Sequence, residues 1–418
     1  MSKRKALVTG VDGQNGFYMS KFLLERGYEV HGSTVFSECL RGSLRKSYGM
    51  MPKIGLLQKT GVILHWGNLS DFYYSDSMEP VIKEVMPDEV YNFGARTHVG
   101  DSFNRIRDTF EITGLGPIKL LESLRHLKPN VKFFQPSSAE MFGEVLETPQ
   151  NETTPFNPQS PYAKAKVYSY FKSREYREKF GMFVSNGIFF NHESEKRPED
   201  FVTRKITRKL ADIKTKKLHL LLKDGLRNLN VWQPVLELGN LDAKRDWGYA
   251  PDYMEVVWQI MQHHKADDFV VGTGETHSVR EFLEESARVM GLNIHSNRRS
   301  GLEEKYLDKD EETVVKISPD LFRPAEVNLL LANPNKIKRE LGWEAKTKFK
   351  DLVGIMCKAD LELAEDGYQC GGKIEKYFNF KSHEGRILNE AELERHVDQL
   401  RFIHSGLNRI ERELLSCE

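Results

Sequence analysis

The sequence predicts an α/β fold built on a doubly wound parallel sheet, and two observations support this prediction. Between residues 5 and 135, short apolar segments alternate with segments of helical periodicity. A glycine-rich turn also follows the first apolar segment and opens the first helical one, an arrangement typical of dinucleotide-binding folds. We therefore expect a Rossmann-like sheet, a smaller C-terminal α/β lobe that binds the substrate, and a helical tail.

The expected elements are short apolar or amphipathic segments separated by polar residues, glycine and proline. In chain order they are strand 5–9, helix 17–26, strand 29–35, strand 62–66, helix 78–85, strand 89–93, helix 109–124 and strand 132–135. Ligands of such a sheet bind at the carboxyl ends of its strands. The residues that follow each strand are therefore the candidates for a binding site.

The chain is expected to divide into three parts. We place a dinucleotide-binding Rossmann domain at residues 1–190, a lobe interleaved with it at 191–368, and a helical extension at 369–418. Leucine and isoleucine recur at three- and four-residue spacing between residues 393 and 414, which predicts an amphipathic helix that joins subunits or packs on its own domain. The segment 218–235 is expected to form an inserted hairpin on the substrate side.

The composition of the chain limits the classes of protein to which it can belong. The 418 residues carry a formal net charge of zero, so bulk charge indicates neither a nucleic-acid partner nor an anionic membrane surface. The four cysteines show no Cys-x-x-Cys spacing, which argues against a structural metal site and a disulfide framework. Met1 is followed almost directly by the first strand, and no apolar run is long enough to span a bilayer. We expect a cytoplasmic protein without a metal ion.

A turn of the form Gly-x-x-Gly-x-x-Gly joins the first strand to the first helix at residues 10–16. Glycines permit a tight turn there and allow a pyrophosphate to approach the backbone at the positive end of a helix. The turn predicts a nicotinamide dinucleotide site. The candidate contacts within it are Gly10, Gly13, Gln14, Asn15 and Gly16.

Tyr162 and Lys166 are four positions apart, so on a helix they lie on one face about one turn from each other. A phenol loses its proton near pH 10, and a neighbouring ammonium favours the phenolate. The pair therefore predicts a general base. Its alternative is an ordinary exposed helix pair.

Further candidates follow other strands of the predicted sheet. They are Asn68 and Leu69 after the third strand, Gly94, Ala95 and Arg96 after the fourth, and Ser138 and Glu140 after the fifth. Because the carboxyl ends of parallel strands meet at one edge, we expect these residues to lie near the glycine turn.

From the first strand to about residue 368, the chain resembles the GDP-mannose 4,6-dehydratase family of extended short-chain dehydrogenases/reductases. Beyond the glycine turn and the Tyr162/Lys166 pair, the resemblance rests on the strings at residues 190–194, 201–205, 238–248, 274–282 and 323–327. It implies conversion of GDP-mannose to GDP-4-keto-6-deoxymannose, a step in deoxysugar biosynthesis, by a homo-oligomer that is a dimer or a tetramer.

The resemblance also implies roles for four catalytic residues. Tyr162 takes the proton of the C4 hydroxyl, and Lys166 tunes Tyr162 and holds the cofactor ribose. Ser138 polarises the C4 oxygen, and Glu140 removes the C5 proton so that the C6 hydroxyl leaves as water. A simple epimerase or reductase of this fold needs no such acid-base residue, so Glu140 argues against those activities.

The remaining site residues follow from the same resemblance. His192 and Arg197 are expected to reach the cofactor. The expected contacts to the nucleotide sugar, besides Ser138 and Glu140, are Asn191, Val202, Lys205, Arg245, Arg323 and Glu326. Arg245 is followed by Asp246, so a structural ion pair is its alternative role.

The segment after the second strand departs from the family pattern. The family usually has an arginine pair after this strand, and its first member contacts the 2′-phosphate of NADP. This chain has no arginine at residues 33–37. Asn68 stands where the family has an aspartate that contacts adenine. No acidic residue ends the second strand, which disfavours the usual ribose contact of NAD. Arg41 or Arg45 could supply a phosphate partner. We expect NADP, with NAD as the alternative.

Two alternatives to the expected function stay open. The substrate could be another GDP-sugar such as GDP-manno-heptose, because a larger C6 substituent changes the pocket and leaves the catalytic residues alone. A non-catalytic protein that binds a nucleotide sugar or NADP is the second alternative. It would be favoured by loss of Ser138, Glu140, Tyr162 or Lys166, and none of these is lost.

Overall fold

The structure is a computed structural model that describes residues 3–35, 57, 59–70, 77–215, 235–321, 327 and 329–369, with side chains up to residue 365. Arg41, Arg45, Arg323 and Glu326 lie outside the described residues. The same holds for the segment 218–235 except its last residue, and for the extension 369–418 except its first.

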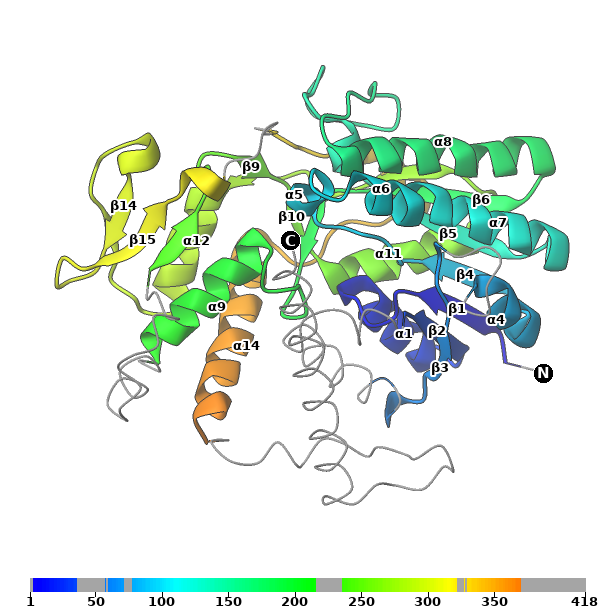
Figure 1. The fold of residues 1–418 in the computed structure, drawn as a ribbon, viewed down its shortest axis with the longest axis horizontal. Helices are drawn as coiled ribbons and strands as arrows, with labels where there is room; N and C mark the ends of the chain where they lie inside the picture. The colour runs from blue at the N-terminus through cyan, green and yellow to red at the C-terminus, as the bar shows by residue number, and fades with distance from the viewer. Residues whose placement is uncertain are drawn as a thin grey trace, which may run out of the picture.

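The described chain folds into two lobes (Figure 1). The helices are α1 (Gln14–Glu25), α4 (Met78–Val85), α5 (Val99–Ser102), α6 (Ile106–Thr109), α7 (Gly116–Leu127), α8 (Pro161–Phe180), α9 (Val202–Lys214), α11 (Ala250–Gln262), α12 (Val279–Val289), α13 (Asn335–Leu341) and α14 (Phe349–Gln369). The strands are β1 (Lys5–Thr9), β2 (Glu29–Thr34), β3 (Ile63–Trp66), β4 (Glu89–Asn92), β5 (Lys132–Ser138), β6 (Phe183–Phe189), β7 (Asn191–Glu193), β8 (Leu236–Leu238), β9 (Lys244–Arg245), β10 (Trp247–Tyr249), β11 (Asp268–Val271), β12 (His277–Ser278), β13 (His295–Ser296), β14 (Lys305–Leu307) and β15 (Thr313–Ile317).

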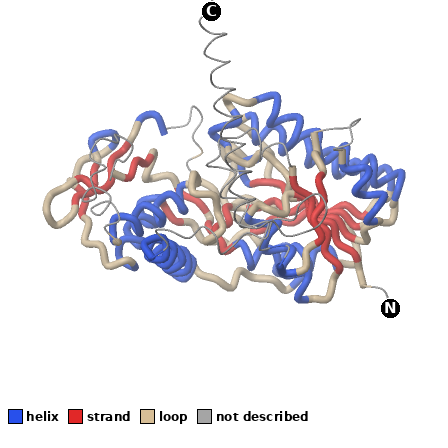
Figure 2. The backbone as a smooth tube through the Cα atoms, turned by 60° about the horizontal axis from the view of Figure 1, so that its bottom comes forward, coloured by secondary structure: helices blue, strands red, loops and turns tan. Residues whose placement is uncertain are grey.

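The larger lobe is organised around a seven-stranded sheet with the order β11-β6-β5-β4-β1-β2-β3. Every neighbouring pair in it is parallel. Figure 2 shows these strands as a twisted fan with helices on both sides. The chain passes from β1 to β2 on one side and later places β4 on the other, so a topological switch point lies between β1 and β4. The predicted doubly wound sheet is confirmed.

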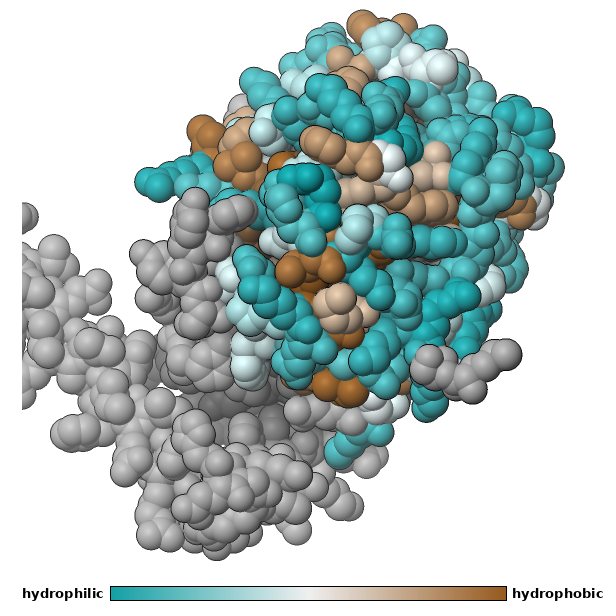
Figure 3. Space-filling model, turned by 90° about the vertical axis from the view of Figure 1, so that its right-hand side faces the viewer, coloured by the Kyte–Doolittle hydropathy of each residue, from teal (hydrophilic) through white to brown (hydrophobic). Residues whose placement is uncertain are grey.

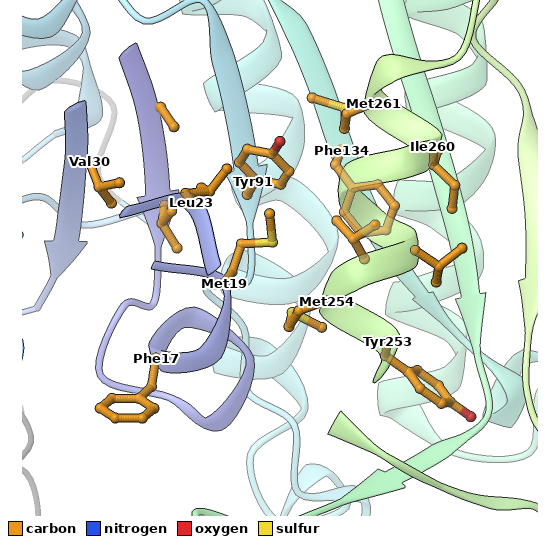
Figure 4. Close-up of a cluster of buried hydrophobic side chains, with 14 of the residues drawn as sticks. Phe17, Met19, Leu23, Val30, Tyr91, Phe134, Tyr253, Met254, Ile260 and Met261 are labelled. Carbon is orange, nitrogen blue, oxygen red and sulfur yellow. The ribbon is translucent and has the colours of Figure 1, made fainter. Parts of the chain in front are cut away.

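Alternating side chains give the sheet two apolar faces. Ala6 and Val8 belong to the cluster that α1 and α11 cover, whereas Leu7 belongs to the cluster beneath α4 and α7. Figure 4 shows the first cluster, with Met19 of α1 and Met254 of α11 between the two helices and the sheet. The helices of both layers are therefore fixed by burial against the sheet.

Later parts of the chain return to the larger lobe. Strand β11 forms one edge of the sheet, and α11 packs against α1. Trp343, which follows α13, lies in the same buried cluster. The division at residue 190 is kept as a proposal, since these returning elements interleave the two lobes.

The smaller lobe combines a four-stranded sheet with helices α9, α12 and α14. The sheet has the order β13-β14-β15-β8, with β15 and β8 parallel and the other pairs antiparallel. The three helices contact one another and share one apolar cluster with the sheet. Two short ladders, β7 with β10 and β9 with β12, complete the described strands.

Element bounds differ from the sequence prediction at three places. Helix α1 begins at Gln14, directly after the glycine turn, and ends at Glu25. Strand β5 continues to Ser138 because it pairs with β6 as far as Phe189. The expected helix 109–124 contains a π-helical turn at 110–115 before α7 begins, and Pro117 at the start of α7 lacks an amide hydrogen.

The surface shown in Figure 3 is mostly hydrophilic, with its hydrophobic residues in small separate groups. Single exposed hydrophobic residues are common on folded proteins and need no partner to explain them. Among the described residues, no helix is both long enough and apolar enough to cross a membrane.

Candidate active site

The glycine turn forms a narrow cradle at the switch point between β1 and β4. Gly10 has a φ of +60°, and a Cβ placed on it would lie 2.9 Å from Gly94 Cα. A Cβ on Gly16 would lie 2.2 Å from Gly10 O, and one on Gly94 would lie 2.6 Å from a methyl carbon of Leu69. Gly10 and Gly16 therefore exclude side chains, because the atoms that a Cβ would meet belong to the backbone. Gly13 is the N-cap of α1 and contributes no side chain to the cradle.

Gln14 and Asn15 connect the cradle to β7. The Gln14 Nε2 group donates to His192 O at 3.0 Å, and Gln14 Oε1 accepts from Ser194 Oγ at 2.8 Å. His192 Nε2 lies 2.9 Å from Asn15 Oδ1. Three of the predicted cofactor residues thus lie side by side, although β7 is far from the glycine turn in the sequence.

His192 is held as a neutral imidazole. Its Nδ1 lies 3.0 Å from Phe190 O, and its ring stacks on Tyr253 with a centroid distance of 4.9 Å. Burial, followed by the positive charges of Arg197 and Lys166, lowers the pKa of His192 to about 3. His192 therefore carries no charge at neutral pH.

Helix α8 presents Tyr162 and Lys166 to the end of β5. The helix begins with Ser160, whose Oγ accepts from Ala163 N at 3.1 Å, and with Pro161 in its first turn. Both Tyr162 and Lys166 are buried. The pair is therefore not the exposed helix pair that was its alternative.

The ammonium of Lys166 does not contact the phenol directly. Lys166 Nζ donates to Pro136 O at 2.7 Å and lies 5.9 Å from the centroid of the Tyr162 ring. Burial lowers the pKa of Lys166 to about 8. Lys166 is thus placed beside the carboxyl end of β5.

Burial raises the pKa of Tyr162 to about 12, which differs from the sequence expectation of a lowered value. A hydrogen bond from Ser138 and the positive charge of Arg197 act in the opposite direction, and the negative charge of Glu140 adds to the rise. The expectation was wrong because burial of the phenol outweighs the hydrogen bond from Ser138 and the positive charge of Arg197.

Ser138 and Glu140 lie at the turn that ends β5. Ser138 Oγ accepts from Glu140 N at 3.2 Å, which caps the short 3₁₀ turn Ala139–Met141. Both side chains are half-buried. Both side chains lie near enough to the phenol to shift the pKa of Tyr162, and we call the region around the hydroxyl, the carboxylate and the phenol the common space.

Arg197 follows β7 and is held by two contacts. Its Nε lies 3.2 Å from an oxygen of the buried Glu193, and its guanidinium lies 3.7 Å from the centroid of the Phe201 ring. Glu193 also accepts from Thr203 Oγ1 at 2.7 Å, and burial raises the pKa of Glu193. Arg197 is therefore fixed near the phenol and the imidazole.

The residues that are predicted to contact adenosine line a small cavity at the end of β3. Asn68 Oδ1 accepts from Ser70 N at 2.9 Å, an arrangement typical of an Asx turn. Leu69 packs beside Gly94 and Gly116. The walls of the cavity are Asn68, Leu69, Ser77, Met78, Glu79, Gly116, Lys119, Leu120 and Ser123. Ala95 and Arg96 follow β4 nearby, where Arg96 N donates to Thr113 Oγ1 at 3.0 Å.

The predicted nucleotide-sugar residues belong to two regions of the smaller lobe. Asn191 begins β7 opposite Trp247, and Val202 begins α9. Lys205 lines an open groove with Glu199, Arg208, Lys209, Asp212 and residues 235–237. Burial lowers the pKa of Lys205. The groove is thus a mixed-charge surface beside the first turns of α9.

Arg245 and Asp246 have separate surroundings. Arg245 is buried on β9 and donates from Nη1 to Lys244 O at 3.0 Å. The Asp246 carboxylate accepts from the backbone amides of Thr273, Gly274 and Ala332. Burial raises the pKa of Asp246 to about 6. Asp246 therefore fixes neighbouring loops, which makes it a poor candidate for the structural partner of Arg245.

Several contacts around the site were not found by sequence reasoning. Arg204 donates to the fully buried Asp360 of α14 at 2.8 Å, and to the carbonyl oxygens of Glu195 and Arg197. Asp12 in the glycine turn accepts from Thr34 at the end of β2. Both pairs join residues far apart in the sequence, so no local pattern indicates them.

Among the described residues, no group of three or more histidine, cysteine, aspartate or glutamate side chains could hold a metal ion. The polar groups at this site are a phenol, an ammonium, a hydroxyl and a carboxylate. This set suits proton transfer next to a bound dinucleotide.

Comparison with known proteins identifies close relatives. The family model described as GDP-mannose 4,6 dehydratase matches residues 7–356. A GDP-mannose 4,6 dehydratase of Dictyostelium discoideum is 41% identical over 368 residues, which cover 87% of this chain and 98% of the relative. The human GDP-mannose 4,6 dehydratase is 41% identical over 363 residues, which cover 86% of this chain and 91% of the relative.

Solved structures with lower identity share the fold. The dTDP-glucose 4,6-dehydratase of Bacillus anthracis in complex with NAD has a TM-score of 0.65 at 17% identity, covering 87% of this chain and 98% of its own. RMD from Pseudomonas aeruginosa, complexed with NADPH, has a TM-score of 0.62 at 18% identity, covering 86% of this chain and 100% of its own.

Proposed function

This chain belongs to the GDP-mannose 4,6-dehydratase family, and from that premise we propose that it converts GDP-mannose to GDP-4-keto-6-deoxymannose. The observation that carries the proposal is the common space faced by Ser138, Glu140 and Tyr162 beside the glycine cradle. A dehydratase needs a base for the C4 hydroxyl and a second acid-base group for C5 and C6. The carboxylate and the phenol supply both in one place.

The residues present fit a nicotinamide dinucleotide. The cradle leaves no room for a Cβ at Gly10 or Gly16, which is what close approach of a pyrophosphate to the backbone requires. Gln14, Asn15 and His192 would line the nicotinamide side, and Asn68 and Leu69 the adenine side. A bound nicotinamide would supply the acceptor for the C4 hydride and the donor of the hydride that C6 receives.

Tyr162 is proposed to accept the proton of the C4 hydroxyl. At rest its raised pKa keeps the phenol protonated, and the Ser138 hydrogen bond and the Arg197 charge favour the phenolate. The Lys166 ammonium lies within one helical turn and provides a further cation for the ionised form. Ser138 holds the C4 oxygen while the proton moves along the Ser138–Tyr162 hydrogen bond.

Glu140 is proposed to remove the C5 proton and to protonate the departing C6 hydroxyl. The 4-ketone acidifies the C5 hydrogen, so a half-buried carboxylate is a sufficient base. The same carboxyl group then returns the proton to the C6 oxygen, which leaves as water. An epimerase has no such step, and the presence of Glu140 in the common space supports the dehydratase.

The nucleotide end of the substrate is proposed to bind along the smaller lobe. Lys205 and Arg245 are cations that suit a diphosphate, and Asn191 at the start of β7 and Val202 at the start of α9 are the further proposed contacts. Arg323 and Glu326 remain contacts expected from the sequence. We also keep the homo-oligomer and the cytoplasmic location as proposals, the former to be tested by light scattering.

Mass spectrometry of the reaction products tests the proposed function. The purified protein is incubated with GDP-mannose and either NAD or NADP, with GDP-manno-heptose in parallel. We expect a product of GDP-mannose lighter by one water, and a smaller yield from the heptose. An isomer of unchanged mass would indicate an epimerase, and binding without any product would indicate the non-catalytic alternative.

A further inference from the structure

The carboxyl end of β2 is the place where a doubly wound fold distinguishes its dinucleotides. An acidic side chain there accepts hydrogen bonds from the adenosine ribose of NAD, whereas an arginine nearby accommodates the 2′-phosphate of NADP. Strand β2 ends at Ser33 and Thr34, which are neither acidic nor basic. By sequence position alone, this end of the strand selects neither cofactor.

The structure brings a carboxylate to this position from the glycine turn. Thr34 Oγ1 donates to Asp12 Oδ1 at 3.0 Å, and Val11 N donates to Ser33 O at 3.3 Å. The turn lies tightly on β2, since a Cβ on Gly32 would be 2.7 Å from a methyl carbon of Val11. Asp12 therefore brings a carboxylate within hydrogen-bonding distance of the last residue of β2.

The surroundings of Asp12 leave its negative charge without a compensating cation in the described part of the chain. No ion pair joins Asp12 to a lysine or an arginine there, and the Asp12 Oδ2 atom accepts no hydrogen bond from a described residue. Asp12 is half-buried and Thr34 is buried. The Thr34 hydroxyl orients the carboxylate and leaves one oxygen able to accept.

We infer that Asp12, oriented by Thr34, makes this protein select NAD over NADP. The inference rests on the proposed function, because it concerns the cofactor of that site. The two ribose hydroxyls of NAD are donors that suit a carboxylate acceptor. A 2′-phosphate has only acceptors facing the carboxylate and carries a charge of about −1.5 to −2 at neutral pH, so it is repelled. This differs from the NADP expected from the sequence.

Two measurements that do not depend on turnover test the inference. The nucleotide retained by the purified protein is released by denaturation and identified by mass spectrometry. Isothermal titration calorimetry of the protein freed of nucleotide then gives the dissociation constants for NAD and NADP. We expect NAD to be retained, and we expect NADP to bind at least about tenfold more weakly than NAD.

The variant Asp12→Asn removes the charge and keeps an oxygen for the Thr34 hydroxyl. We expect it to bind NADP about tenfold more tightly than the unchanged protein does, with NAD affinity reduced a few-fold at most. The matched control is Asp310→Asn, an exposed aspartate in the smaller lobe, which should leave both affinities unchanged.

Retention of NADP, or tighter binding of NADP than of NAD by the unchanged protein, overturns the inference. If Arg41→Ala then weakens NADP binding, the loop after β2 supplies a phosphate partner as the sequence suggested. If NADP is retained or binds more tightly, and water is lost from GDP-mannose with NADP, the proposed function stands while the inference falls. Absence of binding to either dinucleotide would overturn both.

Discussion

At the scale of single residues, Glu140 separates dehydration from simple oxidation and reduction. We expect Glu140→Gln to retain oxidation at C4 and to lower the rate of water loss by about 10²–10⁴-fold, since the amide cannot take the C5 proton. Tyr162→Phe should stop both steps. Formation of the reduced dinucleotide is followed by its absorbance in a single turnover, and the dehydrated product by mass spectrometry.

The control for this comparison is Glu144→Gln. Glu144 is an exposed carboxylate four residues beyond Glu140 in the same segment, so its replacement should leave both steps unchanged. Normal water loss by the Glu140 variant would show that another group performs the elimination.

A second residue, His192, is predicted to contribute to the loss of folding stability at low pH. Its pKa is about 3 in the folded protein and about 6.5 in an unfolded chain, so between these values the unfolded chain binds more protons. The stabilisation is complete above about pH 6.5 and is lost as the pH falls towards 3. Part of the ring surface is exposed, which reduces the effect.

His192→Gln should therefore lose about 1 kcal/mol less unfolding free energy than the unchanged protein between about pH 7 and about pH 5. Urea denaturation at the two pH values measures this difference, with the exposed His264→Gln as the control. Equal losses in the His192 variant and the unchanged protein would mean that His192 is not held neutral by the fold.

At the scale of elements, the glycine turn determines how β1, α1 and β4 meet. Gly16→Ala places a Cβ 2.2 Å from Gly10 O, a backbone atom that cannot move without shifting the turn. We expect a loss of stability of about 1–3 kcal/mol and loss of the retained nucleotide. Thermal unfolding and analysis of the released nucleotide provide the two measurements.

Gly354→Ala is the matched control, because a Cβ at this position of α14 meets no atom within 4 Å. A helical alanine in open space should raise stability by about 0.5–1 kcal/mol. If Gly16→Ala behaves like Gly354→Ala, the turn is looser than the structure indicates and the cradle does not exclude side chains.

The sequence predicts these elements well where the signal is local. The bounds of β1 to β4 agree with the predicted segments to within one residue. The extension of β5 to Ser138 depends on pairing with β6, and the π-helical turn before α7 depends on how the chain crosses the sheet. Such tertiary causes leave no mark in the local pattern.

The site divides in the same way. Tyr162 and Lys166 are one helical turn apart, and this spacing, together with the glycine turn, predicted that they belong to one site. The contacts of Asp12 with Thr34, Gln14 with Ser194 and Arg204 with Asp360 join residues 22, 180 and 156 positions apart. The raised pKa of Tyr162 was missed for the same reason, since burial depends on the whole fold.

At the scale of the whole molecule, the proposed reaction requires both lobes to bind one substrate. The larger lobe holds the cradle and the catalytic space, and the smaller lobe offers the cations of the groove. Arg204 fixes part of the site within the smaller lobe, because it joins α9 and α14 to the segment that carries Arg197. A GDP-sugar that spans the lobes fits this arrangement.

The central claim is that one site removes a hydride from C4, eliminates water and returns the same hydride to C6. It is tested most directly with GDP-mannose that carries deuterium at C4, incubated with the purified protein and analysed by mass spectrometry and NMR. We predict a product lighter by one water that keeps its deuterium, now at C6. A product without deuterium, or with deuterium still at C4, would contradict the account.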